Sequence, residues 1–477
     1  MTSVNSGIAL GYVAIEWAIR IAMLAVVPFR RSPDAARSWL LLVFFLPVPA
    51  LVLYLLIGRP TYPKWRHERF ARARELLADP IRQLRQSPDC CQPELPENLA
   101  MAAFLIEHLG QFPALGGNRV TLLADYDGVL KRLVADIDGA QSHVHLLSYI
   151  FADDVAGQLV IDALLRAAAR GIHCCVLIDA LGSRNWARGV FRQLTAGGVD
   201  VAIALPQSLL RWRRTRADLR NHRKIFIIDA RIAYIGSQNI VAAAFSPGVL
   251  NRELVVEASG PIVLALQAVF VADWFVETDT ILSREQLFPT QDAGKGVVAQ
   301  LLPSGPDYPV PGAERLIVAL VHGARRRVVL TTPYFIPDES LMQALQTAVL
   351  RGVEVKLIVS RIMDNRFVDL AQRSYYDELL KAGVIIHRYR PGLLHAKHIS
   401  IDAEVCVIGS MNVDIRSFAL NAEASLIIYD AEVTAKLRDE QDRNLADSDR
   451  LIPAQWARRP FPSKIVENVA RLLSPLL

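Results

Sequence analysis

The chain has 477 residues, of which 52% are hydrophobic, and its formal net charge is +5. This length is too great for one hydrophobic core and fits about two or three domains. The hydrophobic fraction is high for a soluble protein and low for a polytopic transporter, so we expect a localised membrane segment. A charge of +5 does not by itself identify a nucleic-acid or lipid partner.

The cysteines do not follow a metal-binding or disulfide pattern. They form two adjacent pairs and a singleton, with no C-x-x-C spacing, at Cys90, Cys91, Cys174, Cys175 and Cys406. This arrangement predicts neither a zinc site nor a disulfide framework. We therefore expect reduced, buried thiols.

Two apolar runs occupy the beginning of the chain. Ser38–Ile57 is uncharged and has the length of a bilayer-spanning helix, roughly 20 residues, although Pro47 and Pro49 are expected to bend it. Ile8–Phe29 contains Glu16 and Arg20, whose i,i+4 spacing permits an ion pair on one helix face. This earlier run either spans the bilayer or lies in its interface. We predict that it spans, which makes residues 1–60 a transmembrane helical hairpin.

The basic residues around these runs give a divided signal about orientation. Several follow the second run, which predicts that this side and the rest of the chain face the cytoplasm. The loop between the runs is also basic, and a hairpin places the two basic segments on opposite faces of the membrane. We base the prediction on the longer segment, which follows the second run.

The rest of the chain is predicted to contain a linker and two similar domains. Residues 61–110 are charged and then proline-containing, which indicates a linker with an amphipathic helix. A strand–helix–strand pattern over 144–182 recurs over 328–360. Such units favour a mainly parallel sheet covered by helices, and we assign the two domains to residues 111–290 and 291–477.

One motif occurs twice with identical spacing. Its first copy is His222, Lys224, Asp229, Gly236, Ser237 and Asn239, and its second copy is His395, Lys397, Asp402, Gly409, Ser410 and Asn412. A lone histidine on an apolar strand is usually a core residue, but this recurrence is improbable by chance. The apolar residues between the fixed positions predict a strand, a turn and a second strand in each copy.

These residue types suit the transfer of a phosphodiester group. Residues two apart on a strand share a face, so each histidine is expected to share a pocket with the lysine of its motif. A neutral imidazole can attack phosphorus, and a protonated one can donate to the leaving oxygen. The lysines and the motif asparagines can hold the non-bridging oxygens. We therefore predict one active site built from both copies.

Four motif residues have two possible roles. Asp229 and Asp402 are assigned to the catalytic set, but they are equally suited to ordering neighbouring backbone. Ser237 and Ser410 are assigned to substrate binding, with turn formation as the alternative. Metal ligands do not accompany the motif, so we expect catalysis without a metal or other cofactor.

A nucleophilic histidine needs a carboxylate on its second nitrogen to fix its tautomer. Glu253 follows His222 in the apolar run ELVVEASG, and Glu423 follows His395 in NAEASLIIYD. A buried glutamate in such a run needs a partner. We predict these two glutamates as the partners, with Glu257 as the competing choice in the first copy.

The paired motifs resemble the two HKD motifs of the phospholipase D superfamily, and the chain resembles the bacterial cardiolipin synthases within it. Other segments support the resemblance over nearly the full length: Gly58-Arg59-Pro60, Ser148-Tyr149-Ile150-Phe151, the run from Thr332 to Glu339, and the run from Met411 to Ser417.

The resemblance implies a pseudo-twofold pair of α/β/α sandwiches with one active site at their interface. It also implies that the N-terminal hairpin anchors the protein in the bacterial inner membrane. It implies that phosphatidylglycerol donates its phosphatidyl group to His222 and releases glycerol. A second phosphatidylglycerol then attacks to give cardiolipin, with His395 as acid and then base. The residues alone do not separate the two histidines.

Two further segments suit an anionic phospholipid bilayer as partner. The basic loop 211–216, with Arg220, either gathers lipid headgroups or is a solvated loop. The C-terminal segment from Trp456 is expected to form an amphipathic helix that lies on the bilayer or packs against the catalytic body.

Rival interpretations keep the same chemistry and change the acceptor to water, serine or ethanolamine. A nuclease is less consistent with a membrane anchor, so no nucleic-acid partner is expected. A non-catalytic membrane scaffold is disfavoured because both motifs are intact. The oligomeric state is left open.

Overall fold

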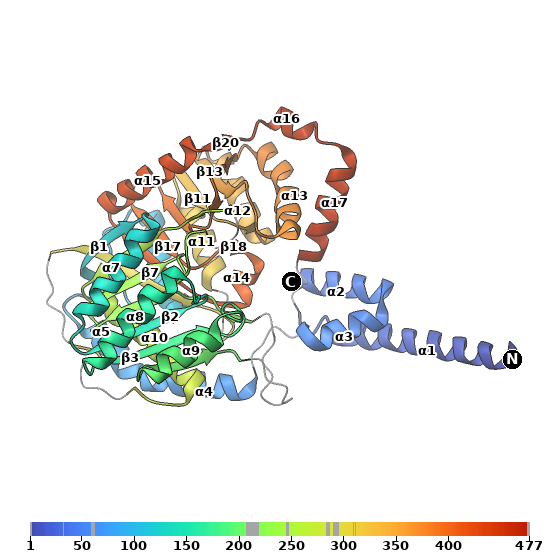
Figure 1. Cartoon of the computed structure of the whole chain (residues 1–477). Coiled ribbons are helices and arrows are strands. Elements are labelled where there is room, and N and C mark those ends of the chain that lie inside the picture. Colours follow the sequence, from blue (N-terminus) through green and yellow to red (C-terminus); the bar gives the residue numbers. More distant parts are fainter. Residues whose placement is uncertain are drawn as a thin grey trace.

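The computed structural model describes residues 2–31, 33–58, 63–206, 219–244, 248–282, 287–289, 295–308, 310 and 312–474. Figure 1 shows three N-terminal helices that project away from a body of sheets and helices. The projecting helices are α1 (Thr2–Val26), α2 (Pro33–Phe45) and α3 (Pro47–Ile57).

The apolar run Ser38–Ile57 is divided between α2 and α3. Leu46 has φ −134° and ψ 68°, outside the helical region, and Pro47 begins the new helix. Proline lacks an N–H group and clashes with the preceding turn, so it favours the first position of a helix over an interior one. The prediction of one bent spanning helix over this run is therefore wrong. Within the described residues, we find no helix that combines the length and apolar character needed to cross a bilayer.

The three N-terminal helices pack against one another around a small apolar core. Trp39 and Tyr54 meet edge to face with ring centroids 5.1 Å apart, and Met23 and Val43 are buried beside them. The predicted pair on α1 is confirmed, because Arg20 Nη1 lies 3.2 Å from Glu16 Oε2.

Residues 64–110 fold into helices that join the body. These helices are α4 (Lys64–Leu76), α5 (Ala78–Gln86) and α6 (Glu97–Gly110). Arg66 on α4 lies 2.5 Å from Glu277 on α10 (Ile262–Thr278), and both side chains are 2% exposed. Arg69 and Arg72 bind Asp279 at the end of the same helix. These arginines belong to the basic segment after the second apolar run, from which we predicted the orientation in the membrane. In the structure they hold α4 against the body.

The first half of the body contains nine strands and four helices among the described residues. Its elements are β1 (Leu115–Leu123), α7 (Tyr126–Gly139), β2 (His143–Ser148), α8 (Val155–Ala169), β3 (His173–Asp179), α9 (Ala187–Ala196), β4 (Asp200–Ala204), β5 (Arg220–Asn221), β6 (Ile225–Ile228), β7 (Ile232–Gly236), β8 (Asn251–Arg252), β9 (Val255–Ser259) and α10.

The second half repeats this plan with additional short elements. It contains β10 (Val297–Ser304), α11 (Gly312–Gly323), β11 (Arg327–Thr331), β12 (Phe335–Ile336), α12 (Glu339–Leu350), β13 (Glu354–Ser360), α13 (Arg366–Ala382), β14 (Ile385–Tyr389), β15 (Leu393–Leu394), β16 (His398–Ile401), β17 (Val405–Gly409), β18 (Val413–Asp414), α14 (Ile415–Ala419), β19 (Asn421–Tyr429), α15 (Ala431–Ala446), β20 (Ser448–Arg450), α16 (Pro453–Ala457) and α17 (Phe461–Leu473). The predicted boundary between the halves, at residues 290 and 291, lies outside the described residues.

Both halves contribute to one large mixed sheet. The first half runs β4-β3-β2-β6-β7-β9-β1, and the second continues β10-β19-β17-β16-β11-β13-β14 with β20 at the edge. The two orders mirror each other about the antiparallel β1–β10 pair, which joins the halves. The predicted strand–helix–strand units are confirmed as β2-α8-β3 and β11-α12-β13, each with parallel strands.

The expectation of a mainly parallel sheet is wrong. The motif strands β6–β7 and β16–β17 are hairpins with antiparallel pairing, as are the pairs that join them to β9 and β19. Each hairpin is closed by a short turn, and a short turn can join only antiparallel strands. Within the large sheet, parallel pairing inside each half is therefore confined to the outer strands, β2-β3-β4 and β11-β13-β14.

The apolar core has a layer for each half and a layer that they share. Helices α7 and α8 cover one face of the first half-sheet, and α11, α12 and α13 cover the equivalent face of the second. The shared core contains Ile227 of the first motif, Ile408 of the second, and side chains of α10 and α15. The halves are therefore packed as one unit.

We predict that Arg66→Ala lowers the free energy of unfolding by about 3 kcal/mol, because it leaves the Glu277 carboxylate buried without its guanidinium. Urea unfolding followed by tryptophan fluorescence measures the change. Arg72→Ala is the matched control, since its exposed pair with Asp279 is worth less than about 1 kcal/mol. Equal effects of the two substitutions would contradict the proposed importance of the buried pair.

Candidate active site

The histidine and lysine of each motif lie in a short link just before a strand. His222 and Lys224 connect β5 to β6, and His395 and Lys397 connect β15 to β16. The predicted strand–turn–strand then follows as the β6–β7 and β16–β17 hairpins. The reactive side chains thus emerge where the strand begins.

Short parallel strand pairs carry each histidine to the opposite half of the molecule. Strand β5 pairs with β19, and β15 pairs with β8. The His222 backbone N–H donates to the Ala422 carbonyl at 2.9 Å, and the His395 N–H donates to the Arg252 carbonyl at 2.8 Å. Each acceptor immediately precedes a glutamate of the predicted site. The backbone therefore places each histidine next to the other half's glutamate.

The two histidine–glutamate pairs are exchanged between the halves. His222 Nδ1 lies 3.0 Å from both carboxylate oxygens of Glu423. His395 Nδ1 lies 2.6 Å from Glu253 Oε1. The prediction that each histidine binds the glutamate of its own repeat is wrong, because the strand pairing crosses the interface. In both pairs the carboxylate engages Nδ1, which leaves Nε2 to meet a substrate.

Burial keeps both imidazoles neutral at neutral pH. It lowers the pKa of His222 to about 4, although Glu423 acts in the opposite direction. Burial also lowers the pKa of His395, against the influence of Glu253. Burial by itself would raise the pKa of each glutamate, but the facing histidine and neighbouring lysine leave both pKa values below the ordinary range. The result is two neutral imidazoles held by two carboxylates.

The two lysines lie in the same electrostatic environment. Lys224 Nζ donates to the His222 carbonyl at 2.6 Å, and Lys397 donates to the His395 carbonyl. Burial lowers the pKa of Lys224 to about 7 and that of Lys397 to about 8. Lys397 also lowers the pKa of His222, and Lys224 that of His395, so the two motifs influence each other across the interface.

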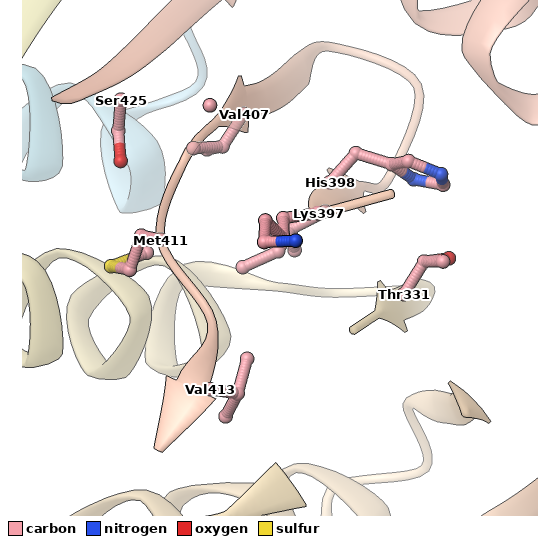
Figure 2. A pocket seen from close by; sticks show the side chains of 9 residues that line it. Thr331, Lys397, His398, Val407, Met411, Val413 and Ser425 are labelled. Carbon is pink, nitrogen blue, oxygen red and sulfur yellow. The ribbon is translucent and has the colours of Figure 1, made fainter. Parts of the chain in front are cut away.

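Lys397 also lines a small cavity beneath the second motif. Its volume is about 10 Å³, and its other lining residues include Thr331, Val407 and Met411. Figure 2 shows Lys397 among these side chains, with the neighbouring His398 ring turned away from it. The cavity is large enough for about one water molecule, so it does not hold a lipid headgroup.

Asp229 and Asp402 lie at the far ends of the motif hairpins. Asp229 accepts hydrogen bonds from the backbone N–H groups of residues 141–143, and Asp402 accepts from those of residues 325–327. Their φ values of 53° and 49° are left-handed, which aspartate tolerates in tight turns. The structure does not bring them to the histidines, and these contacts match the alternative of ordering backbone.

The motif serines lie behind the glutamates. Ser410 Oγ donates to Glu423 Oε2 and accepts from the Ala424 N–H at 3.1 Å. Ser237 Oγ bonds the backbone of Leu254, and it lowers the pKa of Glu253 through a hydrogen bond. These contacts orient the carboxylates of the two pairs.

The motif asparagines are nearly buried beside the same strands. Asn239 is 6% exposed and accepts the Ile150 N–H at 3.1 Å, while Asn412 is 5% exposed and hydrogen bonds to Asp414. The Asn239 contact connects the first motif to the end of β2.

Two residues next to the first motif were not singled out as site residues. The Tyr149 ring meets the His222 ring edge-on at 4.8 Å, and Lys224 Nζ lies 5.2 Å from the centre of the same ring. Arg223 is buried and binds Asp273 at 2.6 Å and the Glu423 carbonyl at 2.9 Å. Two features of the sequence could have identified them. Tyr149 lies in the SYIF segment at the end of β2, and Arg223 stands where the otherwise matching second motif has Ala396.

Glu257 and the basic segment before His222 were also considered as parts of the site. Glu257 binds Arg132 at 2.6 Å and contacts neither histidine, so the competing choice for the first motif is wrong. The basic loop 211–216 lies outside the described residues, but Arg220 is buried and pairs with Asp179 at 3.5 Å. Arg220 therefore supports the strand that precedes His222.

Comparisons with known proteins agree with this geometry. A family model described as "Cardiolipin synthase, PLD-like domain" matches residues 133–274 and 317–445, one segment in each half. Cardiolipin synthase A of Pectobacterium carotovorum (strain PC1) is 34% identical over 95% of this chain and 95% of its own length. Cardiolipin synthase A of Cronobacter sakazakii is 34% identical over 98% and 99%.

A solved structure supports the fold independently. The phosphatidylserine synthase of Haemophilus influenzae superposes with a TM-score of 0.59 at 14% identity, over 79% of this chain and all of its own. The family model matches both halves and the relatives match nearly the full length, so the chain belongs to the cardiolipin synthases with phospholipase D-like domains.

Proposed function

We propose that this protein joins two phosphatidylglycerol molecules to give cardiolipin and glycerol. The observation that carries the proposal is the pair of exchanged histidine–glutamate contacts, which engage Nδ1 of both imidazoles. This arrangement supports a shared site in which both Nε2 atoms and both lysines act on one phosphodiester. The relatives that match nearly the full length are named cardiolipin synthase A, which supports cardiolipin as the product.

In the first step His222 acts as the nucleophile. Its Nε2 forms a bond to phosphorus while the phosphorus–oxygen bond to glycerol breaks, and His395 gives a proton to the departing oxygen. The substrate's negative charge favours the protonated form of His395, whose pKa is low in the free enzyme. Lys224 and Lys397 hold the non-bridging oxygens as charge redistributes.

In the second step His395 acts as the base. It takes the proton of a free hydroxyl on the second phosphatidylglycerol, and that oxygen attacks phosphorus while the bond to His222 breaks. The neutral His222 is then restored, with Glu423 holding Nδ1 throughout. The two histidine–glutamate pairs and their surroundings are supported by the contacts of the motif asparagines and serines, Asn239, Asn412, Ser237 and Ser410.

The assignment of His222 as nucleophile is supported by its surroundings. Arg223 binds Asp273, Ser304 and the Glu423 backbone around the first motif, whereas Ala396 occupies the same position in the second. A nucleophile must be held close to attack geometry, because small misplacements are costly. His395 must meet two different oxygens in turn, which suits the less anchored position.

We also propose that the protein works on the inner membrane of a bacterial cell, with its catalytic halves toward the cytoplasm. Apolar side chains of α1–α3 and of the turn between α1 and α2 are exposed, including Leu10 at 75%, Leu55 at 72% and, in the turn, Phe29 at 90%. Helix α17 is held on α13 by Arg471 and by Arg459, which lies just before the helix. It exposes an apolar face on its other side, comprising Phe461, Ile465, Val466, Val469 and Leu472. A bilayer of anionic phospholipid is the partner that would cover these surfaces.

The proposed reaction predicts that purified full-length protein in detergent converts labelled phosphatidylglycerol, supplied alone, into cardiolipin and an equal amount of glycerol. Thin-layer chromatography and a glycerol assay measure both products. Phosphatidic acid as the sole lipid product would replace the proposal with a hydrolase. Turnover that depends on added serine or ethanolamine would replace it with another transferase.

The exchanged pairs predict that variants of the two glutamates respond in opposite ways to a substrate with a better leaving group. Glu423→Gln and Glu253→Gln should each slow cardiolipin formation by about 10²- to 10⁴-fold, because each misorients one histidine. Phosphatidyl-p-nitrophenol needs no proton for departure, so it should restore release of the leaving group in Glu253→Gln and in His395→Ala. It should not restore release in Glu423→Gln or His222→Ala.

Glu257→Gln is the matched control for these variants and should keep near-normal rates. Rescue of Glu423→Gln together with failure to rescue Glu253→Gln would reverse the assignment of the two histidines. Full activity in either histidine variant would contradict a shared site.

The lysine pKa values predict that kcat/KM falls as pH rises through about 7 to 8. A lysine is charged below its pKa, so the phosphate loses its cationic partners above that range. Lys224→Arg keeps its charge and should move this alkaline limb to higher pH. A profile of kcat/KM that stays flat to pH 9 in wild type would contradict the low lysine pKa values.

A further inference from the structure

A second cluster of reactive side chains lies on the first half-sheet, away from the catalytic histidines. The parallel register aligns His145 of β2 with Cys175 of β3, and Cys175 with Asp200 of β4. His173 precedes Cys175 by two residues, so it lies on the same face. This is the face that α10 covers, since Cys175 and side chains of α10 share one core.

The spacing of these atoms suits a metal ion. One ligand atom each of His145, His173 and Cys175 lies within 4.8 Å of the others. Cys175 Sγ is 3.7 Å from His173 Nδ1. Zinc at its usual bond lengths to sulfur and nitrogen holds tetrahedral ligands roughly 3.5 Å apart. Only small side-chain movements are needed to place all three around one ion.

The surrounding residues orient the two imidazoles as metal ligands. Asp200 Oδ2 lies 2.9 Å from His173 Nε2, and this carboxylate contact leaves Nδ1 as the nitrogen that can bind a metal. Gln267 Oε1 lies 3.2 Å from His145 Nδ1, and Phe270 stacks on the His145 ring with centroids 4.5 Å apart. A carboxylate, backbone carbonyl or water on the second nitrogen is characteristic of histidines that bind zinc, and the Gln267 amide oxygen is an acceptor of the same kind.

The cluster has a route to solvent. His145 and Cys175 are fully buried, whereas the side chain of His173 is 22% exposed. His173 and Asp200 line a surface cavity of about 380 Å³ together with Trp274 and Thr278 of α10. An ion can therefore approach from this cavity, and a water molecule can occupy a fourth ligand position.

We propose that His145, His173 and Cys175 bind a zinc ion, with Asp200 orienting His173. A thiolate and two imidazoles are a ligand set that favours Zn²⁺ over Mg²⁺ or Ca²⁺. The site ties β2, β3 and α10 together at one end of the half-sheet. Strand β2 leads from it to Tyr149, which contacts His222, so the ion stabilises the strand that supports the first motif.

Zinc content and cobalt spectra of the full-length protein in detergent test this site. After treatment with a chelator and dialysis, wild type should take up one Zn²⁺ per chain. With Co²⁺ it should show the thiolate-to-cobalt charge-transfer absorption. Cys174→Ala is the matched control: this adjacent buried cysteine faces the α8 side of the sheet, near the Leu164 carbonyl, and its loss should change neither result.

Cys175→Ala should abolish the charge-transfer band, and His173→Gln should lower zinc content to background. Zn²⁺ should raise the melting temperature of wild type and Cys174→Ala but not of Cys175→Ala. His173→Gln alters a partly exposed side chain, so it tests the site even if Cys175→Ala does not fold. Wild type that takes up no zinc above background, or His173→Gln that binds as much as wild type, would overturn the proposal.

Discussion

The exchange of short strands between the halves is the constraint on which the active site depends. Strand β5 carries His222 to β19, and β15 carries His395 to β8. The same backbone pairs place Glu423 and Glu253 under the imidazoles that they orient. The central β1–β10 pair and the shared core fix the distance between halves, so packing far from the histidines determines their alignment.

The sequence predicted the reactive residues well because they are repeated. Two identical spacings identified the histidines and the lysines, whereas the glutamates were identified as acidic residues in an apolar run after each motif. The histidine–glutamate contacts join the two halves. The pairing of each histidine with the glutamate of the other repeat was not predictable from spacing. The two repeats are alike, so their spacing is the same whether the pairs form within a repeat or between repeats. The role of Asp229 and Asp402 was left open, and their contacts to backbone N–H groups explain the recurrence without direct chemistry.

Other errors have specific physical causes. The sheet was expected to be mainly parallel because strand–helix–strand units dominate the apolar pattern, but the motif hairpins impose antiparallel pairing at the centre. Pro47 was expected to bend a helix, and it begins a new one. The cluster around Cys175 escaped notice because its members alternate along two parallel strands, whereas the cysteine pattern was judged by spacing along one segment.

Because each catalytic pair contains one residue from either half, the chain cannot be divided into two independently working enzymes. A first half alone would contain the proposed nucleophile His222 without its carboxylate, and a second half alone would contain the proposed acid His395 without its own. A single copy of the repeat would complete this histidine–glutamate pair only as a symmetric dimer, with each copy completing the other. In one chain the two copies can differ from each other, as Arg223 and Ala396 do at matching positions.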